Sequence, residues 1–210
     1  MPSGYSKTEV SLKRSDLKAD PVLQFTQWLQ DAISHGELEP TAMTLATVNK
    51  AYEVSARMVL LKQHSPTGFV FFTNYHSPKA HCLTEVPHAA LVFWWPIGQR
   101  QVRITGTVNR TSPEISDNYF RQREKASQIA ALASEQSQVI AERAVLLKNF
   151  DDLTEVYKKT ESVPRPAHWG GYILTPVSFE FWQGSTHRLH DRFAYQRSIE
   201  GDWQITRLSP

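Results

Sequence analysis

The chain has 210 residues, a formal net charge of +2, 40% hydrophobic and 11% aromatic residues, and one cysteine. This length fits one large domain or two small ones, and so small a charge gives no reason to expect a nucleic-acid partner. No apolar run is long enough for a membrane span, no signal-peptide core is present and Cys82 has no internal disulfide partner, so we expect a cytoplasmic protein without a membrane partner.

The first part of the chain is predicted to be a mobile N-terminal segment, residues 1–19, followed by a single domain, residues 20–210. Asp20 before Pro21 is typical of a helix start, because Asp caps free backbone N–H groups and proline is accepted at the first helical position. Apolar residues at helical spacing follow, and Gly36 is expected to end this helix.

Strands dominate the remainder of the domain. Stretches rich in β-branched and aromatic residues predict strands at 42–48, 55–62, 69–73, 89–95, 101–108, 172–182, 188–197 and 203–208. Helices are predicted at 77–85, from the capped start Ser112-Pro113, and along an apolar face from Ile140 to Tyr157. Gly170-Gly171 is expected to belong to a hinge-like connector. The pattern favours a mainly β fold, an antiparallel barrel with added α-helices.

Residues 57–62 place basic side chains at both ends of an apolar strand, which can hold a phosphate at the rim of a sheet. Strict pleating puts Arg57 and Lys62 on opposite faces. They serve one ligand only if a bulge or twist redirects one of them, and otherwise they serve two ligands or two sites. The alternative is a core strand with solvated ends.

Two further groups suit a phosphate. Thr73, Ser77 and Lys79 lie where a strand runs into a helix, although Ser77 could serve only as the helix cap. Tyr119 and Arg123 are four residues apart and are followed at the same spacing by a serine, Ser127. If the helix begun at Pro113 continues, these three side chains share one face and can bind a phosphate ester. The alternative is a solvated helix face.

Residues 188–192 form the last candidate group. Read as a strand, Arg188, His190 and Arg192 project to one face, which is a good anion-binding surface. His187 and His190 then face opposite ways, so no metal site is predicted. The chain has no glycine-rich nucleotide loop and no nucleophile elbow. Phosphate-binding groups without an obvious acid–base pair indicate an enzyme in which a cofactor supplies the chemistry.

A series of motifs in chain order carries a resemblance to a known family. These are Arg57 to Lys62, Phe72-Thr73-Asn74 with Ser77 and Lys79, Arg100-Gln101-Val102, Ser127-Gln128-Ile129, Gln136-Ser137, Trp169-Gly170-Gly171, Phe181-Trp182-Gln183-Gly184, Arg188 to Arg192, and Arg207-Leu208-Ser209-Pro210. From about residue 12 to its end, the chain closely resembles the pyridoxine/pyridoxamine 5′-phosphate oxidases.

The resemblance implies an FMN-binding split β-barrel that spans 20–210, includes C-terminal dimerisation and active-site strands, and forms a homodimer with two active sites at the subunit interface. By analogy FMN is held by Arg57, Met58, Val59, Leu60, Leu61, Lys62, Phe72, Thr73, Lys79, Gln101, Gln136, Ser137, Trp182 and Arg192. Lys62, Tyr119, Arg123 and Ser127 are implied to hold the substrate phosphate. Arg188 and His190 are implied to bind the substrate ring and to be the catalytic residues.

The implied reaction converts pyridoxine 5′-phosphate or pyridoxamine 5′-phosphate to pyridoxal 5′-phosphate, with O2 reduced to H2O2. Two alternatives remain: a split-barrel flavin oxidase acting on another small ring, as in phenazine biosynthesis, and a non-catalytic binder of FMN or pyridoxal phosphate. Tyr119, Arg123 and Ser127 favour the phosphorylated B6 substrate, because an unphosphorylated ring would not need them.

The chain departs from the family pattern at three places. Pro78 stands where the family usually has arginine, which removes one phosphate contact in the FMN loop. Glu124 stands where proline is frequent, which allows a continuous helix. The basic, tyrosine-containing segment that can cover the substrate is out of pattern at Tyr5, Lys7, Lys13 and Arg14.

Overall fold

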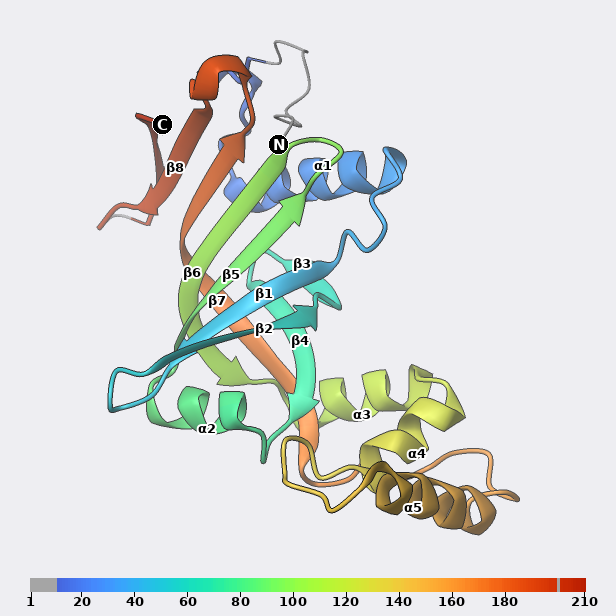
Figure 1. Ribbon diagram of the computed structural model, residues 1–210. Helices are drawn as coiled ribbons and strands as arrows, with labels where there is room; N and C mark the ends of the chain where they lie inside the picture. Colours follow the sequence, from blue (N-terminus) through green and yellow to red (C-terminus); the bar gives the residue numbers. More distant parts are fainter. Residues whose placement is uncertain (1–10, 200) are drawn as a thin grey trace.

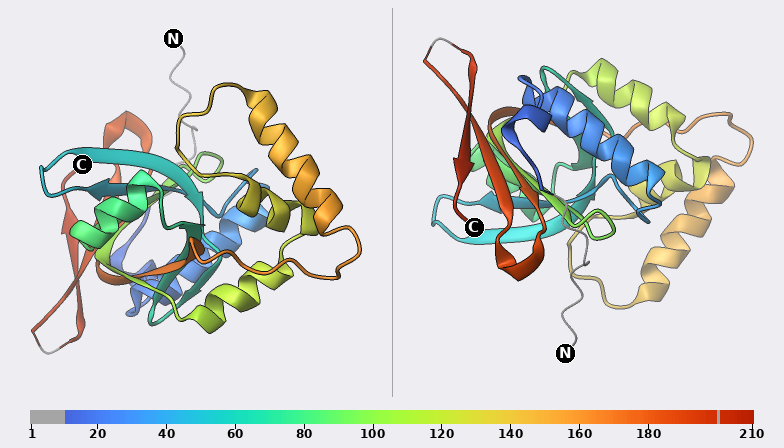
Figure 2. Two further views of the ribbon diagram at one scale, coloured as in Figure 1. Left: turned by 90° about the horizontal axis from the view of Figure 1, so that it is seen from below. Right: turned by 90° about the horizontal axis from the view of Figure 1, so that it is seen from above.

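Figure 1 shows the computed structural model, which describes residues 11–199 and 201–210. Among these residues, nine strands form one antiparallel sheet in the order β2-β1-β5-β6-β7-β4-β3, with β8 paired to β7 and β9 paired to β8. The strands are β1 (Ala42–Val48), β2 (Val54–Leu60), β3 (Gln63–Ser65), β4 (Gly68–Asn74), β5 (His88–Trp95), β6 (Arg100–Arg110), β7 (Trp169–Gln183), β8 (Asp191–Arg197) and β9 (Trp203–Leu208). The predicted antiparallel, mainly β fold is confirmed, and the views in Figure 2 show how the sheet curls.

Helices lie at two ends of this sheet. They are α1 (Pro21–Ser34), α2 (Pro78–Glu85), α3 (Pro113–Gln122), α4 (Lys125–Ala133) and α5 (Arg143–Val156), with 3-10 turns η1 (Arg14–Asp16) and η2 (Thr186–Arg188). In Figure 1, α3, α4 and α5 form a group at the end opposite α1. Within the described residues, no helix combines the length and the apolar character that crossing a membrane requires.

Helix α1 begins and ends as its sequence predicts. The Asp20 carboxylate accepts hydrogen bonds from the backbone N–H groups of Val22 (2.7 Å) and Leu23 (3.3 Å). After the helix, Gly36 has a φ of 81°, a left-handed value that glycine adopts without steric cost. The apolar face between these two signals covers one end of the half-barrel.

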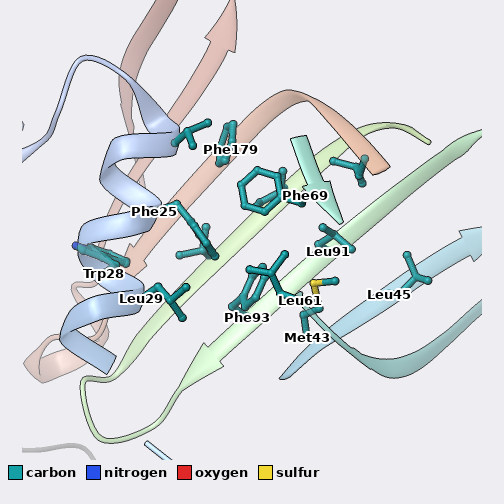
Figure 3. Packing of buried hydrophobic residues seen from close by; sticks show 14 of the residues in the cluster. Phe25, Trp28, Leu29, Met43, Leu45, Leu61, Phe69, Leu91, Phe93 and Phe179 are labelled. Atoms are coloured by element: carbon teal, nitrogen blue, oxygen red, sulfur yellow. The ribbon is translucent and has the colours of Figure 1, made fainter. Parts of the chain in front are cut away.

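The core lies between α1 and the inner face of the sheet, as Figure 3 shows. Phe25 is 0% exposed, and its ring meets those of Phe69 and Phe93 edge to face, each with centroids 4.9 Å apart. Burial of a phenylalanine side chain contributes about 1.5–3 kcal/mol, so this cluster holds α1 firmly on the sheet.

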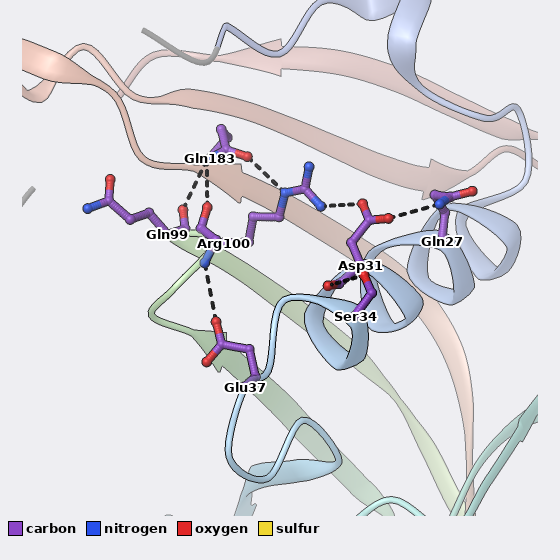
Figure 4. A network of polar contacts seen from close by, with 8 residues as sticks. Gln27, Asp31, Ser34, Glu37, Gln99, Arg100 and Gln183 are labelled. Carbon is purple, nitrogen blue, oxygen red and sulfur yellow. Dashed lines mark hydrogen bonds and ion pairs between the residues drawn. The ribbon is translucent and has the colours of Figure 1, made fainter. Parts of the chain in front are cut away.

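A polar network fixes the same helix to the ends of β6 and β7 (Figure 4). Arg100 donates to the Asp31 carboxylate (2.6 Å) and to the side-chain oxygen of Gln183 (2.9 Å), and its guanidinium lies 4.5 Å from the ring centroid of Trp28. Burial raises the pKa of Asp31, but hydrogen bonds from Arg100 and Gln27 outweigh it, and the net shift is downward.

Residues 11–19 are packed against the last two strands, although the whole segment 1–19 was expected to be mobile. Leu12 and Leu17 are buried. The backbone N–H of Leu12 donates to the Asp191 carboxylate (2.8 Å), Arg207 pairs with the same carboxylate, and Arg207 also donates to the carbonyl of Leu12 (2.9 Å). We call Leu12, Asp191 and Arg207 the terminal clamp.

Part of the lid prediction lies outside the described residues, because it rests on Tyr5 and Lys7. Lys13 and Arg14, which belong to the same pattern, are exposed at η1.

Two sequence predictions about the second half of the fold are wrong. Gly170 and Gly171 are not a hinge but the beginning of β7, where they pair with Thr73 and Phe72 of β4. A Cβ atom at Gly170 would collide with the Tyr75 hydroxyl, which explains why glycine is needed there. The helix expected from Ile140 begins instead at Arg143, and α5 has no buried residue.

Candidate functional site

An open cavity of about 720 Å³ lies between β2, β4 and the group of helices α3 and α4. Its lining combines basic, hydroxyl and aromatic side chains. The lining residues are Arg57, Met58, Val59, Leu60, Lys62, Phe72, Thr73, Lys79, Tyr119, Arg123, Glu124, Ser127, Gln136, Ser137 and Trp169. Most of the residues predicted to hold FMN and the substrate phosphate are therefore brought together.

Arg57 and Lys62 line this one cavity, so strict pleating gave the wrong expectation for them. The strand ends at Leu60, and the next two residues leave its pleat. The Leu61 N–H donates to the carbonyl of Thr41 (2.9 Å), and the Lys62 N–H donates to the carbonyl of Val70 (2.9 Å). This crossing from β1 to β4 turns Lys62 toward the cavity and buries Leu61 in the core, away from the predicted cofactor contact.

Lys79, Thr73 and Gln136 form a compact group of hydrogen bonds at one side of the cavity. The side-chain oxygen of Gln136 accepts from Lys79 Nζ (2.8 Å) and from Thr73 Oγ1 (3.1 Å). Burial, with a smaller contribution from the positive charge of Arg57, lowers the pKa of Lys79 to about 8. The Gln136 oxygen accepts from both an ammonium and a hydroxyl. An oxygen of a phosphate can take the same position, because it accepts from the same donors.

Ser77 does not take part in this group. Its hydroxyl is buried and donates to the carbonyl of Asn74 (2.7 Å), and it makes no side-chain cap bond to α2. The side-chain cap considered for Ser77 from sequence is therefore absent, and its hydroxyl proton is used within the loop before α2.

Arg57 is held by oxygen atoms of β1 and β2. Its Nη1 donates to the carbonyl of Leu45 (2.9 Å) and to Thr47 Oγ1 (2.9 Å), and its Nη2 donates to Ser55 Oγ (2.6 Å). Burial lowers the pKa of Arg57, although a guanidinium remains charged. These bonds fix a positive charge beside Lys79.

Arg123 is the most informative residue of the cavity. Its guanidinium lies over the rings of Trp169 (4.9 Å to the centroid) and Phe120 (5.6 Å). Its Nη1 atom is buried and has no hydrogen-bond partner among residues 11–199 and 201–210. An unpaired buried donor is costly, and the side chain of Arg123 lines the cavity, so the surroundings of this guanidinium indicate a site for an anion.

Aromatic rings form one wall of the cavity. Phe72 stacks on Tyr119 with centroids 4.0 Å apart and planes 13° apart, and on Trp169 at 5.4 Å and 8°. The three rings come from β4, α3 and β7. Trp169 was quoted from sequence only as part of a motif; its contact with Phe72 follows from the pairing of Asn74 with Trp169, which makes Phe72 and Trp169 diagonal neighbours.

The continuous helix expected through Glu124 is not present. Helix α3 ends at Gln122, and Arg123 and Glu124 have extended ψ values of 148° and 142° before α4 begins. The buried Gln128 side chain holds this corner by donating to the carbonyls of Phe120 (3.1 Å) and Arg123 (2.9 Å). Tyr119, Arg123 and Ser127 still reach one cavity, because the corner folds α4 back toward α3.

The other predicted cofactor residues lie elsewhere on the sheet. Gln101 of β6 pairs with Trp182 of β7, which pairs with Arg192 of β8, and Trp94 of β5 pairs with Gln101 on the other side. Directly paired residues share a face, so these four side chains form one row on the outer face. We call it the outer row. None of its members lines the cavity.

Arg188 and His190 do not lie in a strand, so the alternation proposed for residues 188–192 is wrong. Arg188 belongs to η2 and has a φ of 62°, and β8 begins only at Asp191. His190 contacts the Trp182 ring at a centroid distance of 4.6 Å, and its Nδ1 lies 3.1 Å from the backbone nitrogen of Ser185. The 3-10 turn and the two residues that follow it, rather than a pleated strand, place these two side chains.

A hollow of similar volume, about 680 Å³, lies between α4, α5 and the loop that joins them. Its lining includes Glu135 and Asp152 but no lysine or arginine, so it lacks the groups that would bind a phosphate.

The curled antiparallel sheet and its basic cavity define a split-barrel protein of the class related to pyridoxamine 5′-phosphate oxidase. Residues 29–157 match the family model described as "Pyridoxamine 5'-phosphate oxidase", and residues 169–210 match "Pyridoxine 5'-phosphate oxidase C-terminal dimerisation region". The chain belongs to the pyridoxine/pyridoxamine 5′-phosphate oxidase family, and the predicted family is confirmed.

Curated relatives agree with this assignment over most of the chain. A pyridoxine/pyridoxamine 5′-phosphate oxidase of Microcystis aeruginosa is 54% identical, and the alignment covers 95% of this chain and 92% of the relative. One of Salinibacter ruber is 47% identical over 98% of this chain and 95% of its own length.

Two solved structures support the fold. PhzG from Burkholderia lata, crystallised with tetrahydrophenazine-1-carboxylic acid, superposes with a TM-score of 0.90 at 28% identity and covers 96% of this chain and 99% of its own. A pyridoxamine 5′-phosphate oxidase-related, FMN-binding protein of Nostoc punctiforme has a TM-score of 0.70 at 14% identity and covers 89% of this chain and 97% of its own. The predicted split-barrel fold is therefore confirmed.

Proposed function

We propose that this protein is an FMN-dependent oxidase that converts pyridoxine 5′-phosphate or pyridoxamine 5′-phosphate to pyridoxal 5′-phosphate, with O2 reduced to H2O2. It works as a cytoplasmic homodimer with two active sites at the subunit interface. The buried, unpaired Nη1 atom of Arg123 carries this proposal, because it marks an anion site in the cavity beyond the Lys79 group.

The residues of the cavity fit the phosphate of FMN. Lys79 Nζ and Thr73 Oγ1 already share one acceptor oxygen, that of Gln136, and a phosphate oxygen can take the same place. Arg57 adds a second fixed positive charge nearby. When bound, FMN accepts two electrons from the substrate and passes them to O2.

The substrate phosphate is assigned to Lys62, Tyr119, Arg123 and Ser127, which line the cavity together. A guanidinium that is already packed against aromatic rings loses little freedom on binding, and each charged hydrogen bond contributes about 1.5–3 kcal/mol. These groups hold the ring in one position against the flavin. Such alignment makes the electron transfer effectively unimolecular.

Arg188 and His190 are assigned to the ring of the substrate. Because His190 Nδ1 accepts from the Ser185 N–H, the neutral imidazole carries its proton on Nε2. The exposed guanidinium of Arg188 supplies a charged donor. Both residues orient the substrate rather than transfer electrons.

The distance between the two groups of residues supports the dimer. Phe72 and Thr73 pair with the beginning of β7, whereas Trp182 lies near its end, roughly 35 Å further along an extended strand. A ligand of cofactor size bound at one end does not reach the other within one chain, so two copies are needed to bring both groups to one ligand.

Exposed apolar residues supply a surface for the second copy. The edge strand β2 exposes Val54 (75%) and Met58 (62%), and Trp94 of the outer row is 49% exposed. Soluble proteins rarely leave an apolar edge strand uncovered. The family match to a dimerisation region at residues 169–210 covers the outer-row residues Trp182 and Arg192.

The likeness to PhzG supports a second candidate, an oxidase acting on another small ring. The Arg123 geometry favours a phosphorylated substrate over this alternative. Purified protein is incubated with FMN and then with pyridoxine 5′-phosphate in air. We expect a bound flavin spectrum, pyridoxal 5′-phosphate and peroxide; bound flavin without aldehyde or peroxide contradicts the oxidase, and failure to take up FMN contradicts the whole proposal.

The affinity for FMN is expected to fall as the pH rises above about 8. Because the pKa of Lys79 is lowered to about 8, the free protein loses this ammonium charge where an ordinary lysine keeps it. A phosphate dianion favours the charged form, so binding above this pH takes up a proton, and log Kd rises by at most about one unit per pH unit. Flavin fluorescence titrations from about pH 6.5 to about pH 9.5 measure the change.

The control is Lys79→Arg, whose guanidinium keeps its charge across this range. It should move the loss of affinity to higher pH. A wild-type affinity that stays constant to the highest pH, or a variant with the same pH profile, would show that Lys79 does not control FMN binding.

A further inference from the structure

We infer that Glu180 is a positioning residue for the cofactor: it holds the guanidinium of Arg192 in the orientation in which Arg192 contacts FMN. This inference rests on the proposed function, in which Arg192 binds the flavin. It concerns a residue that no motif argument singled out.

Glu180 lies between two arginines on the outer face of the sheet. Its Oε1 accepts from Arg192 Nε (2.9 Å), and its Oε2 accepts from Arg103 Nη1 (3.2 Å). The carboxylate side chain is only 13% exposed, compared with 26% for Arg192 and 50% for Arg103. The ion pair between Glu180 and Arg192 is less exposed than the ion pair between Glu180 and Arg103. Solvent therefore weakens its electrostatic attraction less.

The strand register explains this contact. Glu180 and Trp182 are two residues apart on β7 and therefore share a face. Trp182 pairs directly with Arg192, so Glu180 is the diagonal neighbour of that arginine. The same strand thus supplies both a ring of the outer row and the carboxylate that holds its guanidinium.

The hydrogen bonds leave one edge of the Arg192 guanidinium for a ligand. Nε is taken by Glu180, and Nη1 donates to the carbonyl of Ser209 (2.9 Å). The remaining nitrogen, Nη2, makes no hydrogen bond to the described side chains or backbone that would occupy this edge. A guanidinium held at two of its three nitrogens is pre-oriented, which reduces the entropy lost when the third donates to a cofactor.

The carboxylate also balances charge at this place. Without Glu180, the guanidiniums of Arg103 and Arg192 would repel each other, and Arg192 would turn toward solvent. The pKa of Arg192 is raised above its usual value, and the hydrogen bond from Arg192 to Glu180 is the largest cause of this shift. Glu180 therefore sets the direction of the arginine rather than its charge.

The test is a double-mutant cycle on FMN affinity, measured by flavin fluorescence at fixed pH and salt. Four proteins are compared: wild type, Glu180→Gln, Arg192→Ala and the double variant. We expect Glu180→Gln to weaken FMN binding about tenfold in the wild-type background and to have no further effect beside Arg192→Ala. Far-UV circular dichroism and size-exclusion chromatography confirm that each protein is folded and associated as the wild type is.

Arg103→Ala is the matched control, because it removes the other ion pair of Glu180 and leaves the Arg192 bond in place. It should keep FMN affinity within about twofold of wild type. If Glu180→Gln does not fold, Glu180→Asp takes its place in the same cycle with the same expected loss of additivity.

The outcomes separate this inference from the function on which it rests. If Arg192→Ala weakens FMN binding but Glu180→Gln leaves it unchanged, or if the two effects add, the positioning role is overturned and the proposed function stands. If Arg192→Ala itself leaves the affinity unchanged, the assignment of Arg192 to the cofactor fails, and the role of Glu180 fails with it.

Discussion

Replacement of Arg188 by alanine is expected to lower kcat/KM for pyridoxine 5′-phosphate by about 10- to 100-fold, the size of one lost charged hydrogen bond, while FMN affinity stays within about twofold. The two effects separate because Arg188 lies in η2 and is not a member of the outer row. The φ of 62° is equally demanding for arginine and alanine, so the substitution does not change the backbone preference of the turn.

Steady-state rates of aldehyde formation and flavin titration on the same preparation measure the two quantities. Arg197→Ala is the control, since Arg197 is an exposed arginine of β8 that stacks on Trp203 and lies outside both groups of site residues. Unchanged turnover in Arg188→Ala, or a loss of turnover that merely follows a loss of flavin, would show that Arg188 does not orient the substrate.

Replacement of Arg123 by methionine is expected to raise KM for the phosphorylated substrate by about 100-fold and to leave kcat/KM for unphosphorylated pyridoxine almost unchanged. Methionine keeps the packing against Trp169 and Phe120 but removes the charge and the unpaired Nη1 donor. Burial lowers the pKa of Arg123 without discharging it, so the loss should be the same across the pH range of the assay.

The ratio of kcat/KM for the two substrates, with and without phosphate, is the measurement that decides this prediction. Arg121→Met provides the comparison, because Arg121 lies in the last turn of α3, two residues before Arg123, and is exposed to solvent. If Arg123→Met affects both substrates equally, its guanidinium does not read the phosphate, and the substrate assignment of Tyr119, Arg123 and Ser127 loses its support.

The fold was predicted from sequence wherever local signals were strong. Asp20-Pro21 and Ser112-Pro113 are the starts of α1 and α3, with the carboxylate and hydroxyl caps in place. Alternation and β-branched content found the long strands to within three residues at each end. The three-residue strand β3 was missed, because so short a stretch carries no detectable period.

The failures occur where tertiary contacts override the local pattern. Residues 188–190 alternate like a strand, but the turn from β7 to β8 needs a left-handed backbone at His187 and Arg188. Glu124 permits a continuous helix, but the Gln128 amide, which binds carbonyls at the end of α3, stabilises a corner instead. Neither the left-handed turn nor the Gln128 contact can be recognised from the intrinsic propensities of the residues that they place.

The residues of the candidate site were predicted from sequence, but their arrangement in space was not. Resemblance supplied residues such as Lys79 and Trp182 together, whereas the structure separates them into a cavity and an outer row. Pleating alone could not show that Lys62 turns toward Arg57, because the turn depends on the backbone bond to Val70 across the barrel. Glu180 was missed because its importance is visible only through the register of β7 and β8.

The terminal clamp has a consequence for the order in which the molecule assembles. Its bond between Leu12 and Asp191 joins residues 179 positions apart, and the entropy lost on closing so long a loop must be compensated by contacts formed earlier, such as the β8–β9 hairpin. Residues 188–190 directly precede Asp191, so we expect the predicted catalytic turn to reach its final place only when the chain ends meet. Residues 188–190 are then among the last parts of the chain to become ordered during folding and among the first to open in the folded protein.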